Sequence, residues 1–208
     1  MSEKIKQRLL LKEHYVSTQQ IRMIQLRVNR SIRPKSSALM VTSIDEYTDK
    51  PLVSAKLAIS MAQEGKRVLL VDADFSTPTL HEWFQKNNET GWSDAVLKRR
   101  GVQNKIKETL FPNLYLLTTG PANRFSQEMW VPEKIGGVIE ECKKEFDLIL
   151  FISPTFHSSV NAQLLVEYCE GVVLVARANK SKKEELLTTV EAIERSGGKM
   201  LGTILQTG

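Results

Sequence analysis

Three charged side chains stand beside apolar segments in a way that suits phosphate and magnesium chemistry. Lys50 comes shortly after the apolar residues 38–43, and Asp72 and Asp74 close the apolar segment 67–72. A lysine so placed binds phosphate oxygens, and two carboxylates at a strand end bind magnesium or orient a water molecule. Aspartates also commonly cap the turn that follows them, and for an isolated pair this is the more usual role. The residues themselves leave both interpretations open.

The segment "SIDEYTDKPLVS", residues 43–54, would have to complete the phosphate site, and its residue types oppose that function. A phosphate loop follows the pattern G-x-x-x-x-G-K-[ST], because glycines let backbone N–H groups converge on phosphate and the hydroxyl binds magnesium. This segment has no glycine, and Asp49 would repel phosphate. Pro51 lacks an N–H donor, and neither it nor Leu52 carries a hydroxyl. Since proline suits the first position of a helix, the segment is predicted to begin a helix without receiving a phosphate.

A further position expected to carry an acid is apolar. Residues 147–152 form an apolar segment that ends in Ile152. At the end of the corresponding strand, an ATPase built on a parallel sheet with alternating helices presents an aspartate to the metal or its water. Isoleucine can do neither, so we assign no metal ligand. We expect no bound cofactor, and ATP or ADP with Mg²⁺ only if Lys50, Asp72 and Asp74 still function together.

Apolar segments and helical patterns alternate along the chain. Continuous apolar runs, typical of strands covered on both faces, predict strands at 38–43, 67–72, 113–118, 147–152, 171–176 and 199–205. Helical patterns lie at 51–65, 130–145 and 180–198. This alternation predicts an α/β fold in which helices cover both faces of a mostly parallel sheet. With 208 residues, 41% hydrophobic and 25% charged, the chain is expected to form a single domain, 1–208.

The N-terminal arm, residues 1–37, holds nine of the Lys and Arg residues and two acids. Within it, residues 16–32 read as an amphipathic helix. Its apolar positions are Ile21, Ile24, Val28 and Ile32, with Met23 and Leu26 alongside. We expect this helix to pack on its own domain, with another subunit as the alternative. The charge could meet nucleic acid, an anionic membrane surface or an acidic neighbour, or could be a solvated helix face.

The sequence shows neither a membrane-spanning segment, a secretory signal nor a metal-site cysteine pattern, and this bears on where the protein is expected to reside and on the state of its cysteines. No apolar run approaches the roughly 18 to 20 residues that cross a bilayer, and the first residues do not have the pattern of a secretory signal. We therefore expect a cytoplasmic protein. Cys142 and Cys169 have neither metal-site spacing nor nearby histidines, so both are predicted to be ordinary buried or half-buried thiols.

Several segments together resemble a known family. They are "MVTSIDEYTDK", "AKLAISMAQEGKRVLLVDADFSTPTLHEWF", "PNLYLLTTGP", "EFDLILFISP", "VNAQLLVEYCEGVVLVARANKSKKEEL" and "IERSGGKMLGTIL". In order and spacing they are similar to the cytoplasmic domain of the bacterial tyrosine kinases, or BY-kinases, of capsule and exopolysaccharide systems. The resemblance covers nearly the whole chain. It implies a three-layer P-loop NTPase-like fold, related to the MinD and ParA partition proteins, with Walker A, A′ and B motifs.

The resemblance assigns roles by position. Lys50 matches the Walker A lysine that contacts phosphate, and Asp72 and Asp74 match the A′ carboxylates, catalytic only in an active enzyme. Ile152 falls where the Walker B aspartate belongs, and Asn161 replaces another acidic position. The Walker A and Walker B motifs are therefore degenerate.

Other family features are altered as well. A basic pair that follows the A′ aspartates in many members is Ser76 and Thr77 here. The family's N-terminal ExxRxLRTN-like motif, which supports ring-shaped oligomers, reads "IRMIQLRVN", with Ile21 and Ile24 in place of Glu and Arg. The C-terminal tyrosine cluster of the family is not found; the tyrosines are Tyr15, Tyr47, Tyr115 and Tyr168.

These features favour a catalytically inactive relative, a pseudokinase with a regulatory or scaffolding role in capsule or exopolysaccharide biosynthesis and export. The alternative is an active ATP-dependent protein-tyrosine autokinase of the same pathway with unorthodox ligation. A minor alternative is a MinD/ParA-like partition protein, although no DNA-binding motif supports a nucleic-acid partner. The resemblance implies a membrane-embedded co-polymerase or kinase-modulator partner, a homo-oligomer or a hetero-oligomer with an active homologue, and peripheral attachment to the inner membrane face through that partner.

Overall fold

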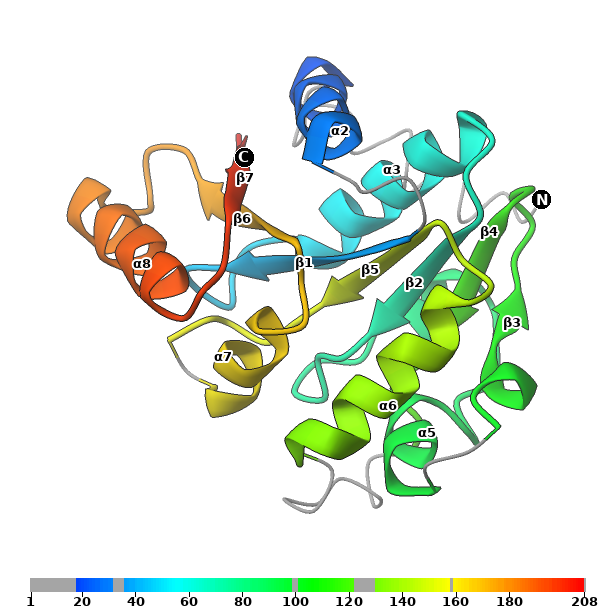
Figure 1. Ribbon diagram of the computed structural model, residues 1–208. Helices are drawn as coiled ribbons and strands as arrows, with labels where there is room; N and C mark the ends of the chain where they lie inside the picture. Colours follow the sequence, from blue (N-terminus) through cyan, green and yellow to red (C-terminus); the bar gives the residue numbers. More distant parts are fainter. Residues whose placement is uncertain (1–17, 32–35, 99–100, 122–129, 158, 208) are drawn as a thin grey trace.

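The computed structural model describes residues 18–31, 36–98, 101–121, 130–157 and 159–207, which contain a seven-stranded sheet (Figure 1). Its strands are β1 (Ser37–Ser43), β2 (Val68–Asp72), β3 (Lys107–Glu108), β4 (Leu114–Leu117), β5 (Leu148–Ile152), β6 (Gly171–Arg177) and β7 (Met200–Gln206). Their order across the sheet is β3-β4-β2-β5-β1-β6-β7. All neighbouring pairs are parallel except β3 with β4, which is antiparallel. The predicted, mostly parallel sheet is confirmed.

Helices cover both faces of this sheet, so the fold has the three layers predicted. They are α2 (Thr18–Ser31), α3 (Lys50–Gln63), α4 (Leu80–Trp83), α5 (Trp92–Lys98), α6 (Pro132–Lys143), α7 (Val160–Val166) and α8 (Lys183–Arg195), with a 3₁₀ turn at Gln103–Lys105. Strand β1 shows the two faces: Ala38 and Met40 join one buried cluster, and Leu39 and Val41 join the other. The first cluster packs under α5 to α8 and the second under α2 to α4, on opposite sides of the sheet in Figure 1.

The predicted strands and long helices are present with shifted ends. All six predicted strands form, and the three predicted helices after the first strand appear as the somewhat shorter α3, α6 and α8. Helix α3 has proline in its first turn and is followed by Gly65, whose φ of +89° suits a glycine stop. The elements that the sequence patterns missed, β3, α4, α5 and α7, are two to seven residues long. Such lengths are too short to show a period.

Helix α2 packs on its own domain, as expected. Ile21, Ile24 and Val28 are buried in the cluster that it shares with α3. The prediction that Met23 and Leu26 belong to the apolar face is wrong, because each exposes 59% of its surface. Their positions in the helical turn place them away from the sheet. Ile32 and most of the basic arm lie outside the described residues.

The same helix covers the free edge of β7 with polar side chains. Gln20 Nε2 donates to the Leu205 carbonyl at 3.2 Å, and Gln20 Oε1 accepts from the Leu205 N–H at 3.0 Å. Arg27 Nη1 donates to the Leu201 carbonyl at 2.9 Å. These bonds satisfy backbone groups that an edge strand otherwise presents to other chains.

Both cysteine thiols lie in the core. Cys142 and Cys169 are free and buried, as predicted, and burial raises the pKa of both, that of Cys142 to about 12. Within the described part of the chain, no helix combines the length and the apolar character that a membrane crossing requires.

Candidate functional site

The predicted site residues gather at the carboxyl ends of β1, β2 and β5. These strands are neighbours in the order β2-β5-β1, and the register pairs Ile152 with both Asp72 and Val41. Lys50 is the first residue of α3, directly after the loop that leaves β1. In an open parallel sheet this edge is where ligands bind, so the fold brings the predicted residues to the expected place.

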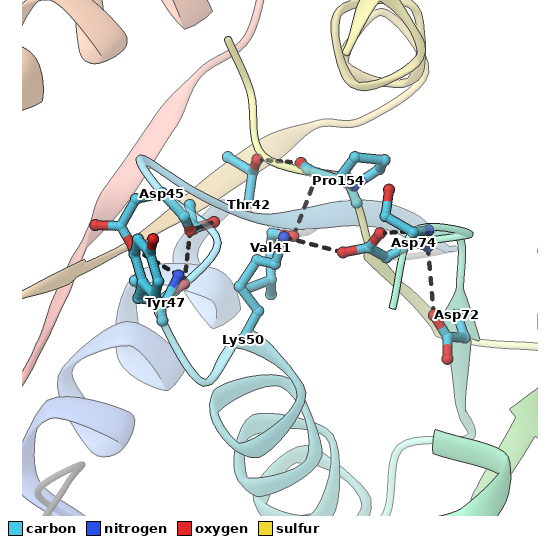
Figure 2. A network of polar contacts seen from close by, with 12 residues as sticks. Val41, Thr42, Asp45, Tyr47, Lys50, Asp72, Asp74 and Pro154 are labelled. Carbon is cyan, nitrogen blue, oxygen red and sulfur yellow. Dashed lines mark hydrogen bonds and ion pairs between the residues drawn. The ribbon is translucent and has the colours of Figure 1, made fainter. Parts of the chain in front are cut away.

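Lys50 forms a buried ion pair with Asp74. Lys50 Nζ lies 3.0 Å from Asp74 Oδ2, and the two side chains expose only 6% and 7% of their surfaces (Figure 2). Asp74 Oδ1 accepts from the Ser76 N–H at 3.1 Å. The lysine that would meet a phosphate is thus neutralised by an acid of the same chain.

Asp72 is also used within the chain. Its Oδ1 accepts from the Asp74 N–H and its Oδ2 from the Leu80 N–H, both at 3.3 Å. Burial, and then the nearby charge of Asp74, raise the pKa of the Asp72 carboxyl to about 7. The two carboxylates hold the turn that follows β2, so the capping role that sequence reasoning left open is present in the structure. Their catalytic role as A′ acids remains a prediction.

Backbone donors of the loop between β1 and α3 are bound by side chains of this protein. The Tyr47 N–H donates to Asp45 Oδ1 at 2.8 Å, and the Leu52 N–H donates to Asp49 Oδ1 at 3.2 Å. Asp49 is therefore the N-cap of α3, and it is more than a repulsive charge. No residue from 43 to 50 has positive φ. The loop consequently lacks the backbone conformation with which glycines direct successive N–H groups at a phosphate.

A side chain from the edge strand β7 also binds the backbone of this loop. Gln206, the last residue of β7, accepts from the Asp49 N–H with Oε1 at 2.8 Å and donates to the Asp49 carbonyl with Nε2 at 3.2 Å. Sequence reasoning missed Gln206 and also Arg177, the last residue of β6. Arg177 Nε lies 3.9 Å from Asp45 Oδ2. Their only signal in the sequence is a polar residue at the end of a strand.

The space left beside Lys50 is small. A cavity of about 40 Å³ opens there, which is room for a few water molecules. Its lining is mostly hydroxyl-bearing and charged: Glu46, Thr48, Lys50, Pro51, Asp74, Ser76, Thr77 and Thr155.

The end of β5 offers no acid to a metal. Ile152 is 1% exposed and packs in the cluster under α2 to α4. Asn161 is half-buried in the first turn of α7. In the residues that the structure describes, no three His, Cys, Asp or Glu side chains are grouped to hold a metal ion.

Comparison with known proteins shows the family of this chain. Residues 48–201 match the model of an AAA domain family. CapB of Staphylococcus aureus, which is named a putative tyrosine-protein kinase, is 30% identical over 168 residues, which cover 81% of this chain and 74% of CapB. The chain belongs to the bacterial tyrosine kinase family. The predicted resemblance is thereby confirmed.

Solved structures agree with this membership. The chimerical protein CapA2B2 has a TM-score of 0.81 and 26% identity, with 90% of this chain and 83% of the chimera covered. The kinase domain of the Escherichia coli tyrosine kinase ETK has a TM-score of 0.77 and 23% identity, with 86% of this chain and 70% of that domain covered, and it supports the fold.

A P-loop fold implies a nucleotide and Mg²⁺ in an active member, and the residues present here do not fit them. The Tyr47, Asp49 and Leu52 N–H groups already have acceptors, and Lys50 is paired with Asp74. Position 51 has no hydroxyl for Mg²⁺, and Ile152 cannot bind it. No catalytic step through these groups follows from this site.

Proposed function

We propose that this chain is a catalytically inactive member of the bacterial tyrosine kinase family, with a regulatory or scaffolding role in capsular or exopolysaccharide biosynthesis and export. The observation that carries the proposal is the internal neutralisation of the phosphate site. Asp74 binds the lysine, while Asp45 and Asp49 accept hydrogen bonds from loop N–H groups. Carboxylates of the protein itself thus bind the ammonium and the N–H groups that a phosphate would need.

The energy of displacing these groups supports the proposal. A nucleotide that recruited Lys50 would leave Asp74 buried without its partner, and breaking a buried pair costs about 3–5 kcal/mol. At about 1.4 kcal/mol for each tenfold change, this lowers affinity by roughly two to three and a half powers of ten. Release of the Leu52 N–H from Asp49 would add about 1 kcal/mol.

The partners follow from the same proposal. An inactive domain retains its folded surface, so it would act in a hetero-oligomer with an active homologue, in a homo-oligomer, or on a membrane-embedded co-polymerase or kinase-modulator protein. Such a partner would hold the chain at the inner face of the membrane from the cytoplasmic side.

Nucleotide binding is the direct test. Isothermal titration of the purified chain with Mg-ATP and Mg-ADP is expected to give no binding in the micromolar range. A variant that restores three positions, Asp49→Gly/Pro51→Thr/Ile152→Asp, is the positive control for a nucleotide-competent version of the fold. Micromolar binding by the natural chain that disappears in Lys50→Met would refute the proposal.

In cells, deletion of the gene is expected to leave total phosphotyrosine unchanged and to alter the amount or chain length of the polysaccharide. Unchanged polysaccharide would contradict the proposed pathway.

An active tyrosine kinase is the second candidate. The observation in its favour is that Lys50, Asp72 and Asp74 do lie together at the carboxyl edge of the sheet. A partner that shifted the loop could free them, so phosphorylation of the chain by Mg-ATP only in the presence of a membrane modulator would favour this candidate. A MinD/ParA-like partition role is the minor one, and retention on nonspecific DNA that falls steeply with salt would support it.

A further inference from the structure

Tyr47 projects from the degenerate phosphate loop into solvent. It exposes 79% of its surface, more than any other large hydrophobic or aromatic side chain in the described ranges. It lies in the turn between β1 and α3, next to Asp45 and Glu46. Neither the core nor the Lys50 ion pair uses its ring, which contacts the Arg177 guanidinium instead.

The other tyrosines of the described chain have structural roles. Tyr168 donates its hydroxyl to the Pro132 carbonyl at 2.7 Å. The ring of Tyr115 packs edge-on against Phe146, with Arg67 over its face at 5.5 Å. Both residues are only partly exposed, which sets Tyr47 apart as an accessible phenol.

Arg177 lies against the Tyr47 ring with incomplete polar partners. Its guanidinium carbon is 5.0 Å from the ring centroid. Its Nε is buried and has no acceptor within hydrogen-bond distance, and the nearest acid atom, Asp45 Oδ2, is 3.9 Å away. A guanidinium forms its strongest bonds with planar or multi-oxygen anions such as phosphate. The site therefore combines an accessible phenol with a neighbouring guanidinium whose buried Nε has no acceptor, and that donor reaches a phosphate on Tyr47 only if the Arg177 side chain turns toward it.

We propose that Tyr47 is a phosphorylation site, modified by an active tyrosine kinase of this family, and that Arg177 binds the resulting phosphate. The Tyr47 oxygen attacks the γ-phosphorus of an ATP held by that kinase. The new O–P bond forms as the bond from the γ-phosphorus to the bridging oxygen breaks, ADP leaves with that electron pair, and a base of the kinase takes the phenol proton. This inference does not depend on whether the present chain binds nucleotide.

Phosphorylation would alter the loop through charge. A phosphotyrosine carries about −1.5 to −2 charges at neutral pH. Asp45, which holds the Tyr47 N–H, would then face a like charge and lose Arg177 to the phosphate. A partly exposed ion pair as long as this one contributes at most about 1 kcal/mol, so the exchange is favourable for Arg177. The hydrogen bond from the Tyr47 N–H to Asp45 Oδ1 is then expected to weaken.

The first experiment asks whether Tyr47 accepts phosphate. The chain is incubated with Mg-ATP, with and without the kinase domain of Escherichia coli ETK, and the modified residue is mapped by mass spectrometry. We expect phosphate on Tyr47 with ETK and its loss in Tyr47→Phe. Absence of phosphate on Tyr47, while ETK phosphorylates itself in the same tube, overturns the inference, as does modification confined to another tyrosine.

The arm without ETK separates this inference from the proposed function. Phosphate on Tyr47 with Mg-ATP alone would support the acceptor site and refute the inactivity of the chain. A chain modified only when ETK is present agrees with both.

The second experiment asks whether Arg177 binds the phosphate. The second pKa of phosphotyrosine is ordinarily about 6 and is followed by ³¹P NMR titration of the phosphorylated chain. Pairing with Arg177 favours the dianion, so this pKa is expected to rise in Arg177→Met, with an intermediate value in the matched Arg177→Lys variant. The same pKa in all three proteins would overturn the role of Arg177.

Discussion

Removal of the Lys50 ammonium should destabilise the fold, because the ion pair with Asp74 is part of the folded structure. The substitution Lys50→Met keeps the length of the side chain and leaves a buried carboxylate without its cation. Breaking a buried pair in this way costs about 3–5 kcal/mol. Asp74 keeps its hydrogen bond from the Ser76 N–H, which places the expected loss near the lower end, about 3 kcal/mol. For a chain of this size that corresponds to a fall in Tm of roughly 6–12 °C.

The assay is urea unfolding of four proteins in a double-mutant cycle. Lys50→Met and Asp74→Asn are measured singly and together, and the double variant should recover much of the loss because no buried charge remains. In a protein that kept Lys50 for nucleotide, the lysine would be free to meet phosphate and its removal would barely change stability. A loss below about 0.5 kcal/mol in Lys50→Met, within the range of ordinary surface substitutions, would refute the structural role assigned to the pair.

Three further perturbations test other parts of the structure. The pKa of Asp72 is raised to about 7 from an ordinary 3.8, so between these pH values the folded chain holds a proton that the unfolded chain has lost. The contribution of the protonated Asp72 to folding stability is therefore complete at acid pH, below 3.8, and is lost as pH rises through 7. Asp72→Asn should therefore gain stability relative to the natural chain by about 1.4 kcal/mol per pH unit between pH 5 and 7, seen in parallel urea titrations; identical slopes would exclude this assignment. Gln206→Ala should speed amide hydrogen exchange at Asp49, with unchanged exchange as the contrary result, since both its bonds to Asp49 are removed. Arg27→Ala should cost about 1 kcal/mol and increase self-association in light scattering, because the Leu201 carbonyl at the sheet edge loses its donor; a chain that stays equally stable and monodisperse would argue against edge protection.

The sheet could be predicted from the sequence because its strands are covered on both faces. Runs such as residues 148–152 are apolar at every position, and in a run this short, bounded by polar residues, that pattern is typical of a buried strand. Strand β3 consists of two charged residues, Lys107 and Glu108, at the edge of the sheet, so no apolar pattern marks it. Helix α7 is only seven residues long, which is too short to show a helical period.

For the site, the sequence predicted which residues gather, Lys50, Asp72 and Asp74, and which groups are missing, but it did not predict most of the contacts. The sequence shows directly that glycine, hydroxyl and acid are absent at positions 49, 51 and 152. It does not show what replaces them, because the replacements come from far along the chain: Asp74 is 24 residues from Lys50, and Gln206 is 157 residues from Asp49. Parallel sheets bring such residues together through crossover connections, and local patterns do not report those contacts.

The cover that α2 places over β7 limits which molecules can take its place. Gln20 imitates a neighbouring strand at Leu205, since one amide side chain both donates and accepts as a peptide group would. A molecule that lifted α2 away with apolar contacts alone would strand these backbone groups without partners. An incoming extended segment that brought its own peptide groups in register would not. Only a segment whose N–H and C=O groups have the spacing of a β-strand can therefore replace α2 at this sheet edge without leaving the β7 backbone groups unpaired.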